Sequence, residues 1–163
     1  CTGFVFIEKP KPRKLLINKM KQYNIPFKYF NGIKNGNDFE DDFGNVIQNA
    51  ELTVSPGKPR SYAFCSDTLY DEQLADEVSG VDLLYHESTF MHDLLDRAKA
   101  TFHSTSVEAA TIALKASAGK LVIGHFSARY KDLLPMLSEA RTVFPKTELA
   151  IEGAKFVVKE KVK

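Results

Sequence analysis

The sequence predicts an α/β domain in which short buried strands form a sheet layered with helices. Three observations predict this fold class. From residue 61 onward, strand-like and helix-like segments alternate along the chain, which is typical of layered α/β domains. Three of the strand-like segments are short apolar runs, as expected for strands buried on both faces. Each of these runs stops at polar residues of the kinds that bind metals or move protons.

The composition fits one soluble domain. The chain has 163 residues, 44% of them hydrophobic, and a net charge of +1, so a surface for nucleic acid would have to be local. No apolar run is long enough to span a membrane. The only cysteines are Cys1 and Cys65, which favours a reducing compartment such as the cytoplasm, with Cys65 as a small core residue. Because the chain starts with Cys and enters a strand-like run at once, we expect it to be part of a longer protein.

The first segment combines a strand with a basic stretch. Residues 2–8 predict a strand, residues 9–13 contain two prolines and exclude a regular element, and residues 14–23 predict a helix. Between Glu8 and Lys21 there are six Lys or Arg residues and one Glu. This stretch is either a solvated helix face or a local patch that contacts phosphates.

Residues 24–59 differ from the rest of the chain. They hold seven Pro or Gly residues with little apolar periodicity, which is unusual within a compact domain. Asp42-Phe43-Gly44-Asn45 predicts a turn between short strands. We therefore expect an inserted, hairpin-like flexible arm that stands off the core.

The core is expected to resume at Ser61. Its predicted strands lie at residues 62–65, 81–85 and 121–123, with a closing pair at 148–152 and 155–158 that turns at Gly153-Ala154. Its predicted helices lie at residues 71–78, 90–100, 106–116 and 133–144. Ser106 and Asp132 are the expected N-cap residues.

Candidate metal ligands and acids follow the three apolar strands. Asp67 follows the first, His86 and Glu87 follow the second, and His125 follows the third. In open α/β sheets, ligands gather at the carboxyl ends of strands. A carboxylate such as Asp67 can bridge two cations, and a neutral imidazole such as His125 can complete the ligand set of one.

Two more residues suit phosphodiester hydrolysis. His103, held by Glu87, could protonate a leaving alkoxide, and Arg129 could pair with a phosphate oxygen. Each candidate also has an ordinary explanation: Asp67 as a turn residue, His86 with Glu87 as a hydrogen-bonded loop pair, and His103 as part of a helix cap. His92 lacks supporting neighbours and is expected to be a surface residue.

Four motifs in this order and spacing resemble the ribonuclease Z family, tRNA 3′-processing endonucleases of the metallo-β-lactamase superfamily. The motifs are Cys65-Ser66-Asp67-Thr68, His86-Glu87-Ser88-Thr89-Phe90, His103-Ser104-Thr105 and Gly124-His125-Phe126-Ser127-Ala128-Arg129-Tyr130. The family writes Ala where this chain has Ser88. The resemblance implies the C-terminal half of a metallo-β-lactamase αββα sandwich over residues 1–163, with residues 24–59 as its arm.

The resemblance also implies roles for single residues. Asp67 matches the aspartate that bridges two Zn²⁺ ions, and His125 matches the last metal-binding histidine. Glu87 and His103 match the proton-donating pair. The substrate-binding residues would be Ser104, Thr105, Ser127 and Arg129. The arm, which in the family grips the tRNA from the partner subunit of a homodimer, lacks the family's common Gly-Pro dipeptide.

The family's His-x-His-x-Asp-His motif does not occur in this sequence. Because this motif is missing, the isolated piece is expected to be inactive and to bind metal weakly or not at all. It is also expected to self-associate through uncovered sheet. For the whole protein, the resemblance implies a zinc-dependent endoribonuclease that removes 3′ trailers from precursor tRNA. Two alternatives remain: a general metal-dependent phosphodiesterase of the same superfamily, and a non-catalytic binding domain.

Overall fold

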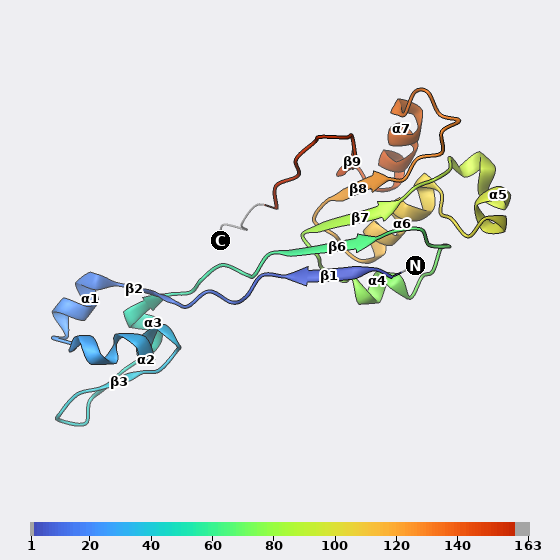
Figure 1. Cartoon of the computed structure of the whole chain (residues 1–163). Helices are drawn as coiled ribbons and strands as arrows, with labels where there is room; N and C mark the ends of the chain where they lie inside the picture. Colours follow the sequence, from blue (N-terminus) through green and yellow to red (C-terminus); the bar gives the residue numbers. More distant parts are fainter. Residues whose placement is uncertain (1, 159–163) are drawn as a thin grey trace. The chain divides into compact units, whose positions relative to one another are not determined.

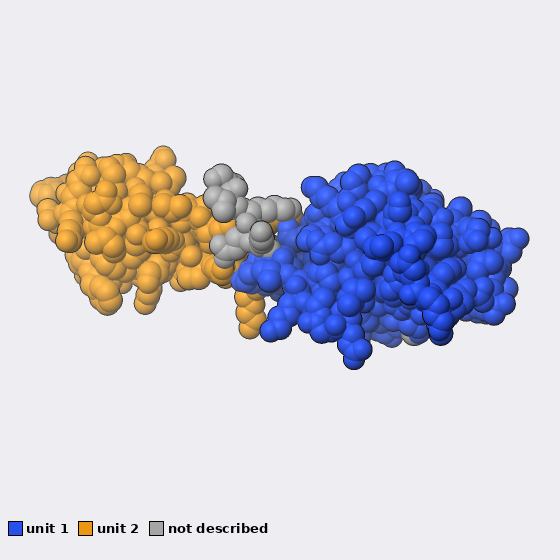
Figure 2. Space-filling model, turned by 90° about the horizontal axis from the view of Figure 1, so that it is seen from above, with its two compact units in different colours: residues 1–8, 60–159 blue, residues 9–59, 160–163 orange. Residues whose placement is uncertain are grey.

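The computed structural model describes residues 2–158, which form two compact units (Figure 2). Within this range, unit 1 comprises residues 2–8 and 60–158, and unit 2 comprises residues 9–59. Each unit has its own buried core. Among the helices of the described residues, none has the length and apolar character needed to cross a bilayer.

Unit 1 is built on a five-stranded sheet (Figure 1). In spatial order its strands are β1 (Phe4–Ile7), β6 (Ser61–Cys65), β7 (Leu83–Glu87), β8 (Leu121–Gly124) and β9 (Thr147–Leu149). Strand β1 runs antiparallel to β6, and the other neighbouring pairs are parallel. The parallel strands therefore bring the ends of β6, β7 and β8 to one edge, as the sequence predicts.

Helices cover one face of this sheet. The helices of unit 1 are α4 (Leu74–Glu77), η2 (His92–Leu94), α5 (Leu95–Ala100), α6 (Ser106–Lys115) and α7 (Leu134–Val143). Ala109 and Ala113 of α6 are fully buried in the same cluster as Leu84 and Ile123 of the sheet. Small alanine side chains let the helix approach closely, and burial of the apolar side chains stabilises this layer.

The other face of the sheet presents aromatic side chains. Phe6 stacks on Tyr62 with ring centroids 5.9 Å apart, and Phe64 stacks on Tyr85 at 4.7 Å. Phe6 is 56% exposed. Gly124 lies directly under Tyr85, since a Cβ atom there would come within 2.5 Å of the phenol oxygen. This face is an apolar surface that nothing in unit 1 fully covers among the described residues.

The structure corrects four predicted elements of unit 1. Strand β7 extends through Glu87 instead of stopping before His86. The predicted helix over residues 90–100 begins as η2 at His92 and continues as α5. Helix α6 is capped by Thr105, not Ser106, because Thr105 and Glu108 form a capping box. The closing strand pair is wrong: β9 pairs in parallel with β8, and residues 155–158 form no strand.

A smaller correction concerns the start of α7. Its N-cap residue is Leu133, whose side chain makes no capping hydrogen bond. The predicted cap, Asp132, still accepts a hydrogen bond from the backbone N–H of Leu134 at 2.9 Å. The helix therefore has a side-chain acceptor at its first turn, one residue earlier than the N-cap position.

Unit 2 has a small core of its own instead of a bare hairpin. Its elements are β2 (Lys14–Leu15), α1 (Ile17–Gln22), η1 (Phe27–Tyr29), α2 (Phe30–Lys34), β3 (Phe39–Glu40), β4 (Val46–Ile47), α3 (Asn49–Leu52) and β5 (Thr53–Val54). The core side chains are Met20, Ile25, Ile33, Phe39 and Leu52. The predicted turn at residues 42–45 is confirmed between β3 and β4.

The unit boundary differs from the predicted start of the arm. Residues 14–23, expected as a helix outside the arm, contribute β2 and α1 to unit 2, and the compact unit begins at Lys9. The reason is that Met20 of α1 is buried against Ile33 and Leu52, residues of the predicted arm. The basic stretch is partly engaged there: Arg13 donates to Thr53, and Lys19 pairs with Glu51.

Candidate active site

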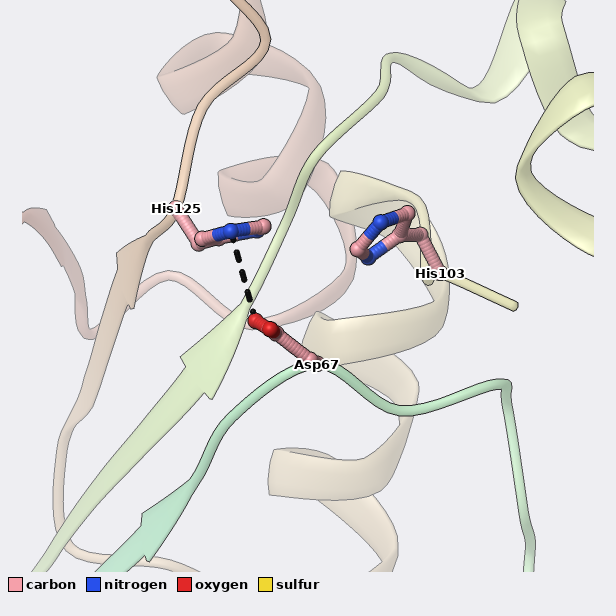
Figure 3. Close-up of side chains that lie close together, drawn as sticks. All are labelled: Asp67, His103 and His125. Carbon is pink, nitrogen blue, oxygen red and sulfur yellow. Dashed lines mark ion pairs between the residues drawn. The ribbon is translucent and has the colours of Figure 1, made fainter. Parts of the chain in front are cut away.

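Asp67, His103 and His125 converge where the parallel strands end (Figure 3). One nitrogen or oxygen atom from each lies within 4.8 Å of the others. The Nε2 atom of His125 lies 3.3 Å from Oδ1 of Asp67. The rings of His103 and His125 have centroids 5.2 Å apart. The structure thus brings together side chains that are up to 58 positions apart in the sequence, by the difference between 67 and 125.

The backbone around this cluster is strained at three points. Asp67 has φ +38°, Phe102 has φ +59° and His125 has φ +60°. Non-glycine residues rarely adopt the left-handed region, and such conformations gather at functional sites. Two of these residues are the candidate metal ligands, and the third directly precedes His103. The strained backbone aims these side chains into the common space beyond the strand ends.

Glu87 is the buried centre of the site. Its side chain is 0% exposed, and its two oxygens accept five contacts. The donors are the backbone N–H groups of Thr68, Thr89 and Ser104, the Thr89 hydroxyl and the His103 ring. A buried carboxylate needs such partners, because leaving it unpaired is costly. The Glu87–His103 pair predicted from the sequence is therefore present in the structure.

His103 is oriented by that carboxylate. Its Nδ1 atom lies 2.9 Å from Oε1 of Glu87. Because a carboxylate only accepts, Nδ1 carries the proton, and Nε2 is left for the side of Asp67 and His125. A ring held in this way can either ligate a metal through Nε2 or donate a proton from Nε2 when doubly protonated.

His86 lies on the opposite side, inside the core. It is 0% exposed, and its Nδ1 donates to the backbone carbonyl of Glu87 at 2.7 Å. Its Nε2 is buried without a hydrogen-bond partner among the described residues. Burial lowers the pKa of the His86 imidazole below its usual value, so the ring stays neutral. It supports the main chain at Glu87 and does not reach the ligand cluster.

Ser104 and Thr105 have structural positions. Both are fully buried. The Ser104 hydroxyl donates to the carbonyl of Thr68 at 2.7 Å, and Thr105 caps α6. Their predicted contact with substrate would require these side chains to leave those bonds. In the structure Ser104 holds the His103 loop against the Asp67 loop, and Thr105 fixes the start of α6. Substrate binding by these two residues stays a prediction.

Ser127 and Arg129 lie at the surface of the loop that follows His125. Arg129 is exposed, and its guanidinium carbon lies 5.3 Å from the centre of the Phe90 ring. Its Nε donates to the Ser127 hydroxyl at 3.3 Å. The aromatic contact orients the cation without neutralising it, which leaves its remaining donors for an anion such as a phosphate.

Some supporting residues were not predicted. His92, expected as a surface residue, is half-buried: its ring Nδ1 lies 3.0 Å from the Thr105 hydroxyl, and its N–H donates to Glu139. No local signal in the sequence could reveal Glu139, which lies 47 positions further along the chain. Ser88, where the family writes Ala, is buried and points to the sulfur of Met136.

The donor set suits a transition metal. One carboxylate oxygen and two imidazole nitrogens form the mixed N/O ligand set that zinc and related ions take in hydrolytic sites. Asp67 and His125 have half-exposed side chains, at 39% and 43%, so a cation could approach them from solvent. The three residues thus fit a metal by chemistry and by spacing.

The comparisons place this fold among metallo-β-lactamase-fold proteins. No protein-family model matches the chain. A solved structure, the metallo-beta-lactamase fold protein YhfI from Bacillus subtilis, aligns with a TM-score of 0.55 and 27% identity. The alignment covers 58% of this chain and 39% of that one. The mixed α/β architecture of unit 1 is therefore part of the metallo-β-lactamase fold, as the sequence predicts.

Within this class, the chain is related to ribonuclease Z. It is 48% identical over 153 residues to a protein named Ribonuclease Z from Bacteroides fragilis, covering 94% of this chain and 50% of that protein. It is 46% identical over 163 residues to the Ribonuclease Z of Cytophaga hutchinsonii, covering 99% and 52%. The resemblance predicted from the four motifs is confirmed. The chain spans about half the length of the curated relatives that it matches.

Proposed function

We propose that the protein to which this chain belongs is a metal-dependent endoribonuclease that removes 3′ trailers from precursor tRNA. The observation that carries this proposal is the buried Glu87–His103 pair beside the Asp67–His125 pair at one sheet edge. The relatives named Ribonuclease Z support the substrate class. The cytoplasm is the expected setting.

The Asp67–His125 pair and the Glu87–His103 pair would have different roles in the reaction. Asp67 and His125 would hold part of a zinc site, where bound zinc would supply charge stabilisation and an activated water. His103, whose Nδ1 is fixed by Glu87, would donate a proton from Nε2 to the leaving oxygen. The Glu87 carboxylate stabilises the doubly protonated ring in that role. Arg129 and Ser127 would contact a phosphate of the RNA.

His103 has a competing role as a third metal ligand, because its ring belongs to the same cluster. We favour the proton-donor role because the carboxylate facing Nδ1 is buried and receives five donors. A carboxylate fixed in this position would stabilise the positive charge of the ring during proton transfer. The two roles differ in what substitution of His103 does to metal affinity, and this difference can be measured.

The direct test is cleavage of a 3′-extended precursor tRNA with added zinc or manganese. It compares this chain alone with a chimera, in which the part of the Bacteroides fragilis relative that this chain does not cover is fused to it. We expect cleavage by the chimera, none by the chain alone, and none by the chimera carrying His125→Ala. Cleavage by the chain alone would contradict our account of the ligand set. A folded, metal-binding chimera without cleavage would contradict the tRNA proposal.

The general phosphodiesterase is the rival enzyme. Unit 2 separates the two proposals, since a small substrate has no need of it. The ends of the insertion meet in unit 1, where the Glu8 N–H donates to the Arg60 carbonyl at 2.8 Å and their side chains pair. A short turn joining Glu8 to Arg60 can therefore replace residues 9–59. We expect this deletion to impair tRNA cleavage and to spare cleavage of a small phosphodiester; retention of both activities would favour the rival.

The binding-domain alternative and the assembly state are tested separately. If the chimera binds precursor tRNA but cleaves neither substrate, a non-catalytic role is favoured. We also propose that the whole protein is a homodimer and that this chain alone self-associates. The exposed Phe4 and Phe6 of β1, beside the half-buried Tyr62 and Phe64 of β6, support the second point. Light scattering over a wide concentration range checks it, and a clean monomer throughout would count against it.

A further inference from the structure

Thr89 connects the two halves of the site. This residue is 7% exposed, and its only role described above is as a donor to Glu87. Its hydroxyl oxygen lies 2.8 Å from Oε2 of Glu87 and 2.9 Å from Nδ1 of His125. Its N–H donates to the same Glu87 oxygen at 2.8 Å, and its carbonyl accepts from the Ser127 N–H at 3.1 Å.

The direction of these hydrogen bonds follows from chemistry. The Thr89 hydroxyl has one hydrogen, and the Glu87 carboxylate can only accept, so the hydroxyl donates to Glu87. Its remaining lone pairs then accept from His125, whose Nδ1 must carry the proton. The Nε2 atom of His125, which faces Asp67 at 3.3 Å, is left as the atom for a metal.

We propose that Thr89 is a positioning residue that links His125 to Glu87 through its hydroxyl, and so fixes the metal-binding ring and the proton-donating pair in one hydrogen-bonded chain. This series of hydrogen bonds runs from His125 Nδ1 through the Thr89 hydroxyl to Oε2 of Glu87, while Oε1 of Glu87 contacts His103. Outer partners of metal-binding histidines fix ring orientation and ligand basicity. This inference rests on the proposed function for its catalytic part, and its metal-binding part can be tested without RNA.

The test uses the chimera with three variants. Thr89→Val removes the hydroxyl and keeps the side-chain shape, and Thr89→Ser restores the hydroxyl. Thr147→Val is the matched control, since Thr147 is buried and its hydroxyl donates to the Phe144 carbonyl in the last strand region, away from the site. Zinc affinity is measured by competition with a chelator. Cleavage of precursor tRNA gives kcat and KM separately.

We expect Thr89→Val to weaken zinc binding by about tenfold or more and to lower kcat with little change in KM. Thr89→Ser should restore both values, and Thr147→Val should change neither. Wild-type zinc affinity and kcat in Thr89→Val would overturn the proposal. So would a loss that Thr89→Ser does not rescue, because that points to packing alone.

The failure of the proposed function has a different signature. If the unsubstituted chimera does not cleave precursor tRNA but Thr89→Val still weakens zinc binding, the substrate proposal fails and the Thr89 link stands. If the unsubstituted chimera binds no zinc, both proposals fail.

Discussion

The two residue pairs at the sheet edge, Glu87–His103 and Asp67–His125, differ in burial and in how many hydrogen-bond partners this chain gives them. Glu87 is fully buried and receives five donors, so its pair with His103 is complete within the chain. Asp67 and His125 are about 40% exposed, at 39% and 43%, and face each other at 3.3 Å. The Glu87–His103 pair, the proposed proton donor, is therefore built into the folded unit. The Asp67–His125 pair, the proposed metal-binding pair, presents partly exposed side chains with room for further ligands.

The largest expected effect comes from a substitution that breaks the buried Glu87–His103 pair. Glu87→Ala leaves several buried donors unpaired and should reduce the free energy of unfolding by about 3–5 kcal/mol. Asp67→Ala removes a half-exposed side chain and should change it by less than about 1 kcal/mol. Urea denaturation of the chain measures both. Similar losses for the two variants would mean that the two halves are equally built into the fold.

The second prediction concerns how the free energy of unfolding depends on pH through the buried His86. Burial lowers the pKa of His86 in the folded state below its unfolded value near 6.5. Below that pH the unfolded chain binds the proton and the folded chain resists it. The contribution of His86 to stability is therefore complete above about pH 6.5 and declines as the pH falls, by at most about 1.4 kcal/mol per pH unit.

Urea denaturation between pH 8 and pH 5 checks this prediction in the wild type and in His86→Gln. The glutamine has no titrating group, so the decline in unfolding free energy should be shallower in the variant. An equally steep decline in both proteins would show that other groups cause it.

A smaller effect is expected at the cap that holds the His103 loop. Thr105→Ala removes the side-chain oxygen that accepts from the Glu108 N–H in the capping box. It should cost about 1 kcal/mol of unfolding free energy, and Thr105→Ser should retain most of it. Thermal or urea unfolding measures both variants. A neutral Thr105→Ala would mean that His92 and Glu108 do not depend on this hydroxyl.

The last prediction concerns reactivity instead of stability, and it locates the boundary between the core and the exposed Asp67–His125 pair. Burial raises the pKa of the Cys65 thiol to about 11, although Cys65 is only two residues before Asp67. At pH 8 we expect Cys65 to react with a disulfide reagent about a hundredfold more slowly than a free thiol. The experiment uses the Cys1→Ser variant, in which Cys65 is the remaining thiol. The control is a second protein with Cys1→Ser, Cys65→Ser and Ser66→Cys, which places the thiol at the half-buried neighbouring position. Equal rates at the two positions would contradict the sharp boundary.

The site was largely predictable because its residues follow strand ends. A short apolar strand, a parallel neighbour and a polar residue at the end are local patterns, and they placed Asp67, Glu87 and His125 at one edge. The motif spacing then pointed to His103. Thr89 belongs to the motif that begins at His86, but its hydrogen bond to His125 spans 36 positions and has no local signal in the sequence.

The errors in the fold have physical reasons. The helix predicted at residues 14–23 was left outside the arm, but its buried Met20 packs within unit 2. The closing strand pair was predicted from apolar residues in 148–158 that line the open face of the sheet: Ala150, Phe156 and Val158 border a pocket there with Tyr62 and Tyr85. Thr105 displaced Ser106 as the cap because Glu108 is three residues after Thr105.

The central claim is that Asp67 and His125 bind the metal while Glu87 and His103 donate the proton. The zinc affinity of the chimera tests it most directly. The measurement compares His125→Ala with His103→Ala by chelator competition. Our account predicts that His125→Ala weakens zinc binding by at least about tenfold. It predicts that His103→Ala retains zinc affinity but loses cleavage. Equal loss of zinc affinity in the two variants would make His103 a metal ligand and would contradict its assignment as the proton donor.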